Sequence, residues 1–575
     1  MSTRCPGDCH RPGPLSKTSS ILAARFAAAA FCVLLALLLG WTPGAHATVS
    51  NNVPLDHWSY DALDKLAGFG LIHSDLKGLR PYTRIETARL VHEALTTREE
   101  RKDLKLPPLI EHFLERFQKE FAEELAVYGR GKATSTGPVV FKPVEEIQAQ
   151  YVFMDGKPRD YVNFSQGVGQ YPGASGSGII ANEGTPLLPN NQGVAYGRGS
   201  NLSLRFSSSV KLWDTFSAYV EPILIVREND TAGRDLAVLS AGQALGRLGA
   251  RDQVNVDLLT GYGKLSNWNV ELEFGRDSLW LGQGSRGTLL LTNNATPLDL
   301  VKLSNPTPTL LPWIFSYLGP IKYMAFASRL EDDRDFPHPY LVGGRVVLKP
   351  HPLFEIGGTG TIVFGGDGSR SLGIPGETSQ ENGLGAIDAR LRLPFLKNAE
   401  IYAEYGGEDI LTDSPYWYEP FMNDIAWLVG IYFPDVLGDG KTDFRFEYAN
   451  NAFNQGPGHG GVWYGHGQYT SGYTYDQMIL GHRMGPDAQD FYTRITHYLR
   501  TDLMFGLDYE HIDRGLTVGR NEERSNGVGT DVTFDFRDNW RVILRYGYES
   551  ISNFNLTAGD DRDNHLLMTT VKYAF

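Results

Sequence analysis

Hydrophobic and polar residues alternate along most of the chain after Glu145. In the segment NWRVILRYGYES, residues 539–550, every second residue from Trp540 to Tyr548 is apolar or aromatic. Charged residues lie between them, namely Arg541, Arg545 and Glu549. A period of two predicts a β-strand with two unlike faces.

The same period recurs in DQVNVDLL (252–259), NVELEFG (269–275), DFRFEY (443–448), DVTFDF (531–536) and LMTTVKYAF (567–575). A soluble β-sandwich also alternates, but here acidic and basic residues are paired on the polar faces. Aromatic residues gather near the ends of the apolar faces, as in the girdles of outer-membrane barrels. We therefore predict an all-β transmembrane barrel of about 16–18 antiparallel strands in residues 139–575. Its apolar face would meet lipid and its polar face a water-filled lumen.

The segment before the barrel has the period of amphipathic helices. Apolar residues recur three and four positions apart in residues 59–70, 83–95 and 108–125, and charged residues fill the other faces. We predict a small α-helical N-terminal module in residues 48–100, followed by an amphipathic helix and linker in residues 101–138. The module is expected on the periplasmic side.

Residues 1–47 have the pattern of a secretory signal peptide. Basic residues precede an apolar run from Phe26 to Leu39, and Ala45-His46-Ala47 matches a cleavage site. Cys5, Cys9 and Cys32 all lie in this segment. The mature protein is thus expected to lack disulfides and cysteine-based chemistry.

Net charge and the motifs present argue against several classes of function. The formal net charge of −14 argues against nucleic-acid binding, which requires a basic surface. The acidic stretch GDDRD (559–563) lacks the spacing of a calcium loop, and His482 and Asp476 have no nucleophile motif beside them. We expect no cofactor, no metal and no enzymatic activity.

Residues 53–95 resemble an S-layer homology motif. The matching elements are His57-Trp58, Gly70-Leu71-Ile72, Pro81 and Thr83-Arg84-x-Glu86. In that family the module binds cell-wall polymers, so the resemblance implies wall-binding roles for Trp58, Thr83, Arg84 and Glu86 and peptidoglycan or a wall polymer as a partner. The alternative is that these residues have a structural role, because Thr83 and Glu86 also fit a helix capping box.

A second resemblance covers most of residues 140–575. The segments FGRDSLWLGQGSRGTLLLTNNATPLDLVKLSNPTP (274–308), YLGPIKYMAFASRLEDDRDFPHPYLVGGRV (317–346) and GYTYDQMILGHRMGPDAQDFYTRITHYL (472–499) resemble the capsule assembly Wzi family. That family consists of outer-membrane barrels that bind capsular polysaccharide. The resemblance implies the same fold, a location in the outer membrane and a polysaccharide partner, either capsular or another exopolysaccharide.

Two aromatic-rich segments, residues 413–424 and 456–477, have the chemistry of a carbohydrate site. Rigid aromatic faces with polar tips can contact sugar rings at low entropic cost. We predict that the segment with Trp463 is an outer loop with exposed aromatic faces. The alternative, that the aromatic residues form a membrane girdle at strand ends, stays open above all for Trp417. The predicted polysaccharide-binding residues are Trp463, Tyr464, His466, Tyr473, His482, Trp417 and Tyr418.

The sequence thus predicts an outer-membrane barrel that binds and anchors surface polysaccharide without turnover. The alternative is a diffusion porin for sugars that the N-terminal module tethers to the cell wall. A third possibility, an outer-membrane hydrolase, would release reducing ends from polysaccharide. Other expected partners are outer-membrane lipid and the barrel assembly machinery, because the terminal Phe575 on an aromatic strand resembles the assembly signal.

Overall fold

The computed structural model describes most of the chain after the predicted signal segment. The described residues are 49–101, 105–129, 139–163, 179–183, 187–188, 190–229, 254–369, 381–408, 424–452, 462–517, 521–537 and 539–575. The expected signal peptide, residues 1–47, lies outside them.

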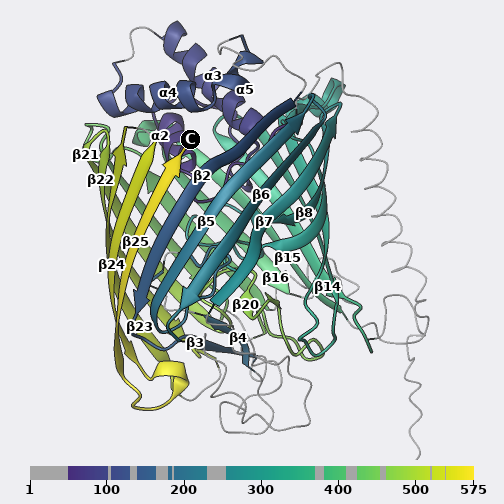
Figure 1. Ribbon diagram of the computed structural model, residues 1–575, viewed down its shortest axis with the longest axis vertical. Coiled ribbons are helices and arrows are strands. Elements are labelled where there is room, and N and C mark those ends of the chain that lie inside the picture. The colour runs from purple at the N-terminus through teal and green to yellow at the C-terminus, as the bar shows by residue number, and fades with distance from the viewer. Residues whose placement is uncertain are drawn as a thin grey trace, which may run out of the picture.

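The described residues form a closed antiparallel barrel of eighteen strands (Figure 1), when β10 and its short continuation β11 are counted as one. The barrel closes where β2 pairs with both β25 and β5. This confirms the predicted fold class. The strands are β2 (Val139–Met154), β5 (Gly199–Leu212), β6 (Phe216–Arg227), β7 (Val254–Asn267), β8 (Val270–Asp277), β10 (Leu298–Ser304), β11 (Thr309–Leu310), β12 (Pro320–Arg329), β13 (Tyr340–His351), β14 (Phe354–Phe364), β15 (Glu381–Leu393), β16 (Ala399–Glu408), β17 (Ile425–Phe433), β18 (Thr442–Asn450), β21 (Ala488–Arg500), β22 (Leu503–Arg514), β23 (Glu523–Phe536), β24 (Trp540–Ser552) and β25 (Arg562–Ala574).

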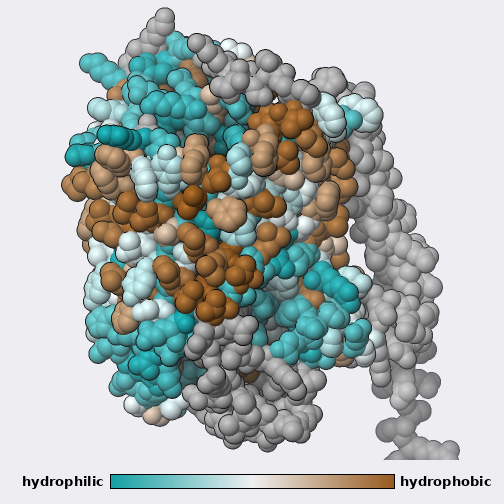
Figure 2. All heavy atoms as spheres, in the orientation of Figure 1, coloured by the Kyte–Doolittle hydropathy of each residue, from teal (hydrophilic) through white to brown (hydrophobic). Residues whose placement is uncertain are grey.

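The two faces of the wall differ as the alternation predicts. On β24, Leu544 points outward and is 49% exposed, whereas its neighbour Arg545 points into the lumen and is 3% exposed. Outward apolar side chains form the brown band across the barrel in Figure 2. Arg545 is not in open water, because its guanidinium forms two hydrogen bonds with Asp508, at 2.7 and 2.8 Å. Arg545 also lines a lumenal cavity, so the expectation that it faces a wet lumen stays a prediction.

The two ends of the barrel differ in the length of their connections. At one end, tight turns such as residues 213–215 and 268–269 join the strands. At the other end the connections are long, for example residues 228–253 and 451–487. In outer-membrane barrels the short turns are periplasmic and the long loops extracellular. The N-terminal helices and the C-terminus both lie at the short-turn end (Figure 1).

Four helices make up the N-terminal module, which has its own apolar core. Trp58 packs against Phe117, with 4.5 Å between ring centroids, and Leu66 and Val91 are fully buried in the same cluster. The sequence predicts one helix over residues 108–125, but the structure breaks it at Phe121. The helices are α2 (Ser59–Gly68), α3 (Arg84–Glu100), α4 (Pro108–Glu120) and α5 (Ala122–Ala126).

Ion pairs hold the module in the lumen. Asp75, between α2 and α3, accepts hydrogen bonds from Lys349 at 2.6 Å and from Arg392 at 3.2 Å. Burial alone would raise the pKa of Asp75, but these cations, with Arg390, hold it well below its usual value. Lys65 on α2 pairs with Asp443 of the wall at 2.9 Å. The module is thus apolar inside and ionic where it meets the barrel.

Long connections from the other end fold inward and fill the rest of the lumen. They carry four short strands, β3 (Arg159–Val162), β4 (Ile179–Glu183), β19 (Thr474–Tyr475) and β20 (Met478–Ile479). A fifth, β9 (Trp280–Leu281), pairs with β1 (Leu79–Arg80) of the N-terminal segment. Together these segments form a buried apolar cluster inside the barrel. Within the described residues, no helix is sufficiently long and apolar to span a membrane.

Candidate functional site

The connection between β18 and β21 contains most of the residues predicted to bind sugar. Its described part, residues 462–487, lies within the barrel, and the side chains of Trp463 and Tyr464 are fully buried. Trp463 donates a hydrogen bond from Nε1 to the Asp424 carbonyl at 2.9 Å. The Tyr464 hydroxyl donates to the Leu289 carbonyl at 2.6 Å and accepts from the His482 backbone N–H at 2.8 Å. These aromatic side chains therefore fix the loop in place.

A second inward loop, residues 278–297 between β8 and β10, is held by carboxylates of the wall. Glu404 on β16 accepts backbone N–H groups from Gln283 at 2.7 Å and from Leu289 at 2.9 Å. Glu447 on β18 accepts the N–H of Arg286 at 2.8 Å. Because carboxyl groups of two strands accept these backbone N–H groups, the wall positions this loop through its backbone.

The side chain of Arg286 adds a further link to the wall. Its guanidinium donates to both carboxylate oxygens of Glu510 on β22, at 2.8 and 2.9 Å. It also lies 4.8 Å from the ring centroid of Tyr492. A bidentate pair of this kind fixes both distance and orientation, which makes the inward loop a rigid part of the barrel.

The β3–β4 hairpin forms the third inward element. Glu183 on β4 accepts the backbone N–H of Ile479 at 2.7 Å and side-chain donors from Asn294 at 3.0 Å and Asn191 at 2.9 Å. Burial raises the pKa of Glu183, although these donors act in the opposite direction. Glu183 thus joins the three inward loops through one carboxylate.

Among the described residues, 331–339 and 466–470 lie together at the long-connection end of the plug, where some of them are exposed. His466 accepts backbone N–H groups at Nδ1 from Gln468 at 3.2 Å and Tyr469 at 2.9 Å, which closes a tight turn. Burial lowers the pKa of His466 to about 4, and nearby Asp335 offsets only part of that effect. Gln468, at the tip of the turn, is exposed. Phe336 is half-buried and packs edge-on against Tyr469, with 5.1 Å between ring centroids.

The predicted exposure of the aromatic residues is wrong for those that the structure describes. Trp463, Tyr464, Tyr473 and His482 come together, but inside the barrel, because the lumen encloses the loop and these rings fill it. Burial, together with the nearby Arg483 and Arg286, lowers the pKa of His482 to about 3. His466 is half-buried at the outer end of the loop. Trp417 and Tyr418 lie outside the described residues.

Sequence reasoning missed the residues that hold or surround the outer turn. Arg334 donates to the Gly472 and Thr474 carbonyls, each at 2.7 Å, and so ties the 331–339 loop to the aromatic loop. Asp335 accepts the backbone N–H of Thr470. The acidic and basic run EDDRD (331–335) was a visible signal, but its partners are about 140 residues away. Sequence spacing alone cannot pair such segments.

The predicted wall-binding residues all make contacts within the chain. The Thr83 hydroxyl accepts the Glu86 backbone N–H at 3.2 Å, as a capping box requires. Glu86 is fully buried and pairs with Arg89 at 2.9 Å, and Arg84 pairs with Glu124 at 2.6 Å. Trp58 donates from Nε1 to Glu120 at 2.8 Å. These contacts give each of the four residues a structural role within the module.

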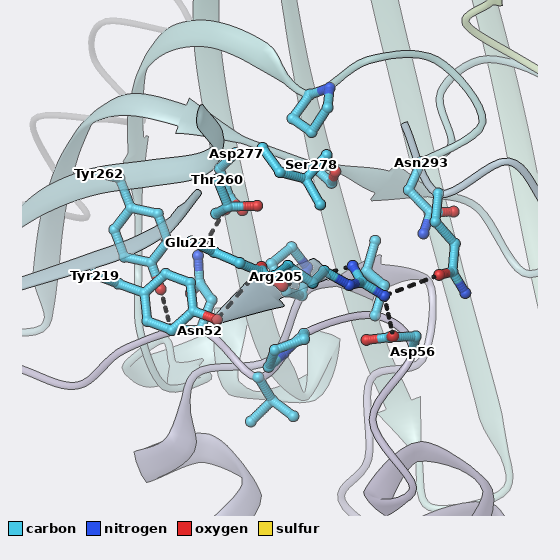
Figure 3. Close-up of a pocket in the computed structure, with 17 residues that line it drawn as sticks. Asn52, Asp56, Arg205, Tyr219, Glu221, Thr260, Tyr262, Asp277, Ser278 and Asn293 are labelled. Atoms are coloured by element: carbon cyan, nitrogen blue, oxygen red, sulfur yellow. Dashed lines mark hydrogen bonds and ion pairs between the residues drawn. The ribbon is translucent and has the colours of Figure 1, made fainter. Parts of the chain in front are cut away.

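A small cavity lies between the N-terminal segment and the wall (Figure 3). It has a volume of about 60 Å³, and Arg205 spans it between Asp56 at 3.2 Å and Glu221 at 3.5 Å. The rings of Tyr219 and Tyr262 are stacked at one side, 5.5 Å apart. This volume suits a few water molecules, and ligand sites are several times larger.

A larger lumenal cavity of about 390 Å³ lies beside α2. Its size would fit a small ligand, but cations already lie against three of its aromatic rings. Arg445 lies 4.4 Å from the Tyr432 ring centroid and Lys65 lies 5.3 Å from that of Tyr498, while Arg286 lies against Tyr492 as described above. Each cation covers one face of its ring, which leaves less aromatic surface for stacking on sugar. The outer surface of the plug is therefore the better candidate site.

Comparisons with known proteins agree with this architecture. The family model described as capsule assembly protein Wzi matches residues 169–566. The solved structure of Wzi from Escherichia coli, described as an outer-membrane, carbohydrate-binding β-barrel involved in group 1 capsule assembly, has a TM-score of 0.62 at 18% identity, with 92% of this chain and 99% of that chain covered. The solved structure of OccAB1 from Acinetobacter baumannii has a TM-score of 0.42 at 10% identity, covering 76% of this chain and 98% of that one.

A curated relative points to the same family. An uncharacterized 55.8 kDa protein in the cps region of Klebsiella pneumoniae is 25% identical over 186 residues. The match spans 32% of this chain and 32% of that protein, which is about a third of its length. The family model, in contrast, covers more than half of the present chain. The chain therefore belongs to the Wzi family of capsule assembly proteins.

Proposed function

We propose that this protein binds capsular polysaccharide, or a related exopolysaccharide, at the cell surface and holds it there without chemical turnover. The observation that carries the proposal is the plug, because its inward loops turn a wide barrel into a rigid platform with an outer face. The description of the Escherichia coli protein as a carbohydrate-binding barrel involved in capsule assembly supports the same function.

The proposed contact surface is the outer face formed by residues 331–339 and 466–470. Phe336 offers part of an aromatic face, and Gln468 and His466 offer polar groups that can bond hydroxyls. Trp463, Tyr464, Tyr473 and His482 belong to this site as the layer that supports it from below. Trp417 and Tyr418, in the connection between β16 and β17, are proposed as further sugar contacts.

The orientation is part of the proposal. Short turns are periplasmic in this class of barrel, so the helical module would lie in the periplasm and the plug face outside the cell. A contact between the module and peptidoglycan, through Trp58, Thr83, Arg84 or Glu86, remains a prediction. Barrel assembly machinery and outer-membrane lipid are the other proposed partners.

Binding by the purified variant Phe336→Ala with Gln468→Ala tests the site. We expect affinity for capsular polysaccharide extracted from the producing cells to fall about tenfold or more, since central contacts dominate such interfaces. Arg500→Ala, an exposed change at the opposite end of the barrel, should leave affinity unchanged. Heat-modifiable migration checks that each variant folds. Unchanged binding by the folded double variant would exclude this face as the site.

A further inference from the structure

Three consecutive turns at the short-turn end carry an exposed tryptophan. Trp213 joins β5 to β6, Trp268 joins β7 to β8, and Trp313 begins the 3₁₀ helix η2 (Trp313–Leu318) between β11 and β12. They are 65%, 66% and 84% exposed, respectively. The turns follow one another around the barrel, because β5, β6, β7, β8, β10 and β12 are successive neighbours. The three indoles therefore line one side of the rim.

The backbone at these positions is strained. Trp213, Trp268 and Trp313 have φ values of 52°, 49° and 58°, in the left-handed region that glycine and asparagine adopt easily and bulky residues rarely. A turn alone would be served better by glycine. The repeated use of tryptophan at strained, exposed tips therefore indicates that the indole side chains have a role of their own.

Further apolar residues extend this side of the rim. Ile314, Phe315, Tyr317 and Leu318 of η2 are exposed, as are Phe395, Leu396, Val436 and Leu437 in the next turns. Residues 307–320 contain no charge. We call these residues, together with the three tryptophans, the apolar sector; it comprises Trp213, Trp268, Trp313–Leu318, Phe395, Leu396, Val436 and Leu437.

Other turns of the rim are charged. The turns between β21 and β22 and between β23 and β24 carry Arg500, Asp502 and Arg537. Here α4 contacts the wall through the ion pair between Arg116 and Asp535, at 2.8 Å. The turns of the apolar sector also carry charges, including exposed Asp214 and Asp439, but residues 307–320 around η2 have none.

We propose that the apolar sector is a membrane anchor that sits in the headgroup region of the bilayer at the short-turn end of the barrel. The sector continues the lipid-facing band of the wall, through exposed Val301 on β10 and Leu310 on β11. Tryptophan and tyrosine with adjoining aliphatic residues are the composition of membrane interfaces. The occupant is therefore phospholipid, and the anchor fixes the depth of one side of the barrel. The anchor itself does not depend on the proposed function. Only its placement in the periplasmic leaflet rests on the orientation proposed there.

Depth-dependent fluorescence quenching tests this anchor. All three natural cysteines precede residue 33, so one introduced cysteine is unique in the expected mature chain. Trp313→Cys and Arg500→Cys would each be labelled with the polarity-sensitive dye NBD and reconstituted in phosphatidylethanolamine–phosphatidylglycerol vesicles. Doxyl groups placed shallow or deep in both leaflets then report depth without reference to orientation. Tyr317→Cys gives a second position in η2 if Trp313→Cys fails to fold.

We expect a blue-shifted emission at position 313, with loss of fluorescence to the shallow quencher, and water-like, weakly quenched emission at position 500. Equal, water-like emission at positions 313, 317 and 500 in heat-modifiable protein would overturn the proposal and leave the sector to a soluble protein or a second copy. Polysaccharide binding by the same labelled proteins is a separate readout. A failure of the anchor is thus distinguishable from a failure of the proposed function.

Discussion

At the residue scale, buried polar atoms in the plug act as cross-links between loops. The Tyr464 hydroxyl accepts the His482 backbone N–H and donates to the Leu289 carbonyl. Leu289 lies 175 residues before Tyr464 in the sequence. Burial raises the pKa of Tyr464, so the hydroxyl keeps its proton and can donate. One atom thereby couples two inward loops.

We predict that Tyr464→Phe loosens the plug but not the barrel. Both partners of the hydroxyl would be left buried and unsatisfied, at a cost of about 1–3 kcal/mol. Limited proteolysis should cut the 462–487 loop faster in the variant, with unchanged heat-modifiable migration. Tyr509→Phe, which removes a hydroxyl from the outer wall, is the matched control. Equal loop protection in Tyr464→Phe and the wild type would contradict this role.

At the element scale, the sequence predicts the strands, whose residues alternate with a period of two. It does not predict the inward loops. Alternation reveals the strands because wall residues face either lipid or lumen, and β24 matches its expected faces residue by residue. The inward loops have no such period. Glu404 meets Leu289 across 115 residues, and nothing local to either residue indicates that pairing. The Gly-rich loop around Trp463 therefore suggested an exposed surface, whereas the lumen made it part of the core.

The helical module offers a second prediction at this scale. Asp75 pairs with Lys349, Arg392 and Arg390, so Asp75→Ala would remove a shared carboxylate from three buried cations, although Glu355 and Glu400 still pair with Arg390 and Arg392. Breaking a buried pair costs about 3–5 kcal/mol. We expect residues 49–129 to become protease-sensitive in vesicles, whereas Glu100→Ala, at the exposed end of α3, should have no effect. Wild-type resistance in Asp75→Ala would show that the ionic contacts are dispensable.

At the scale of the whole molecule, the barrel is closed by structure at both ends. The helical module lies in the short-turn end, and the inward loops fill the other part of the lumen (Figure 1). A barrel of eighteen strands would otherwise enclose an aqueous channel. A closed lumen of this kind distinguishes a binding platform from a porin.

Planar-bilayer recording checks this separation directly. We predict no steady ion conductance for the reconstituted wild type, because both closures must be displaced before ions can pass. A variant with Gly-Ser linkers in place of residues 283–289 and 462–487, and without residues 49–129, should conduct and so proves that the assay detects an open barrel. A steady wild-type channel permeable to small sugars would favour the porin alternative.

The wall carboxylates also set the order in which the molecule can assemble. Glu404, Glu447 and Glu510 belong to β16, β18 and β22, yet the loop that they hold leaves the wall after β8. That loop pairs with the earlier β1 and Glu183, but the three carboxylates that hold residues 283–289 belong to strands much later in the chain. The full set of wall contacts of residues 283–289 can therefore form only after β22 is in place. The fixing of this loop is thus a late step in the assembly of the interior.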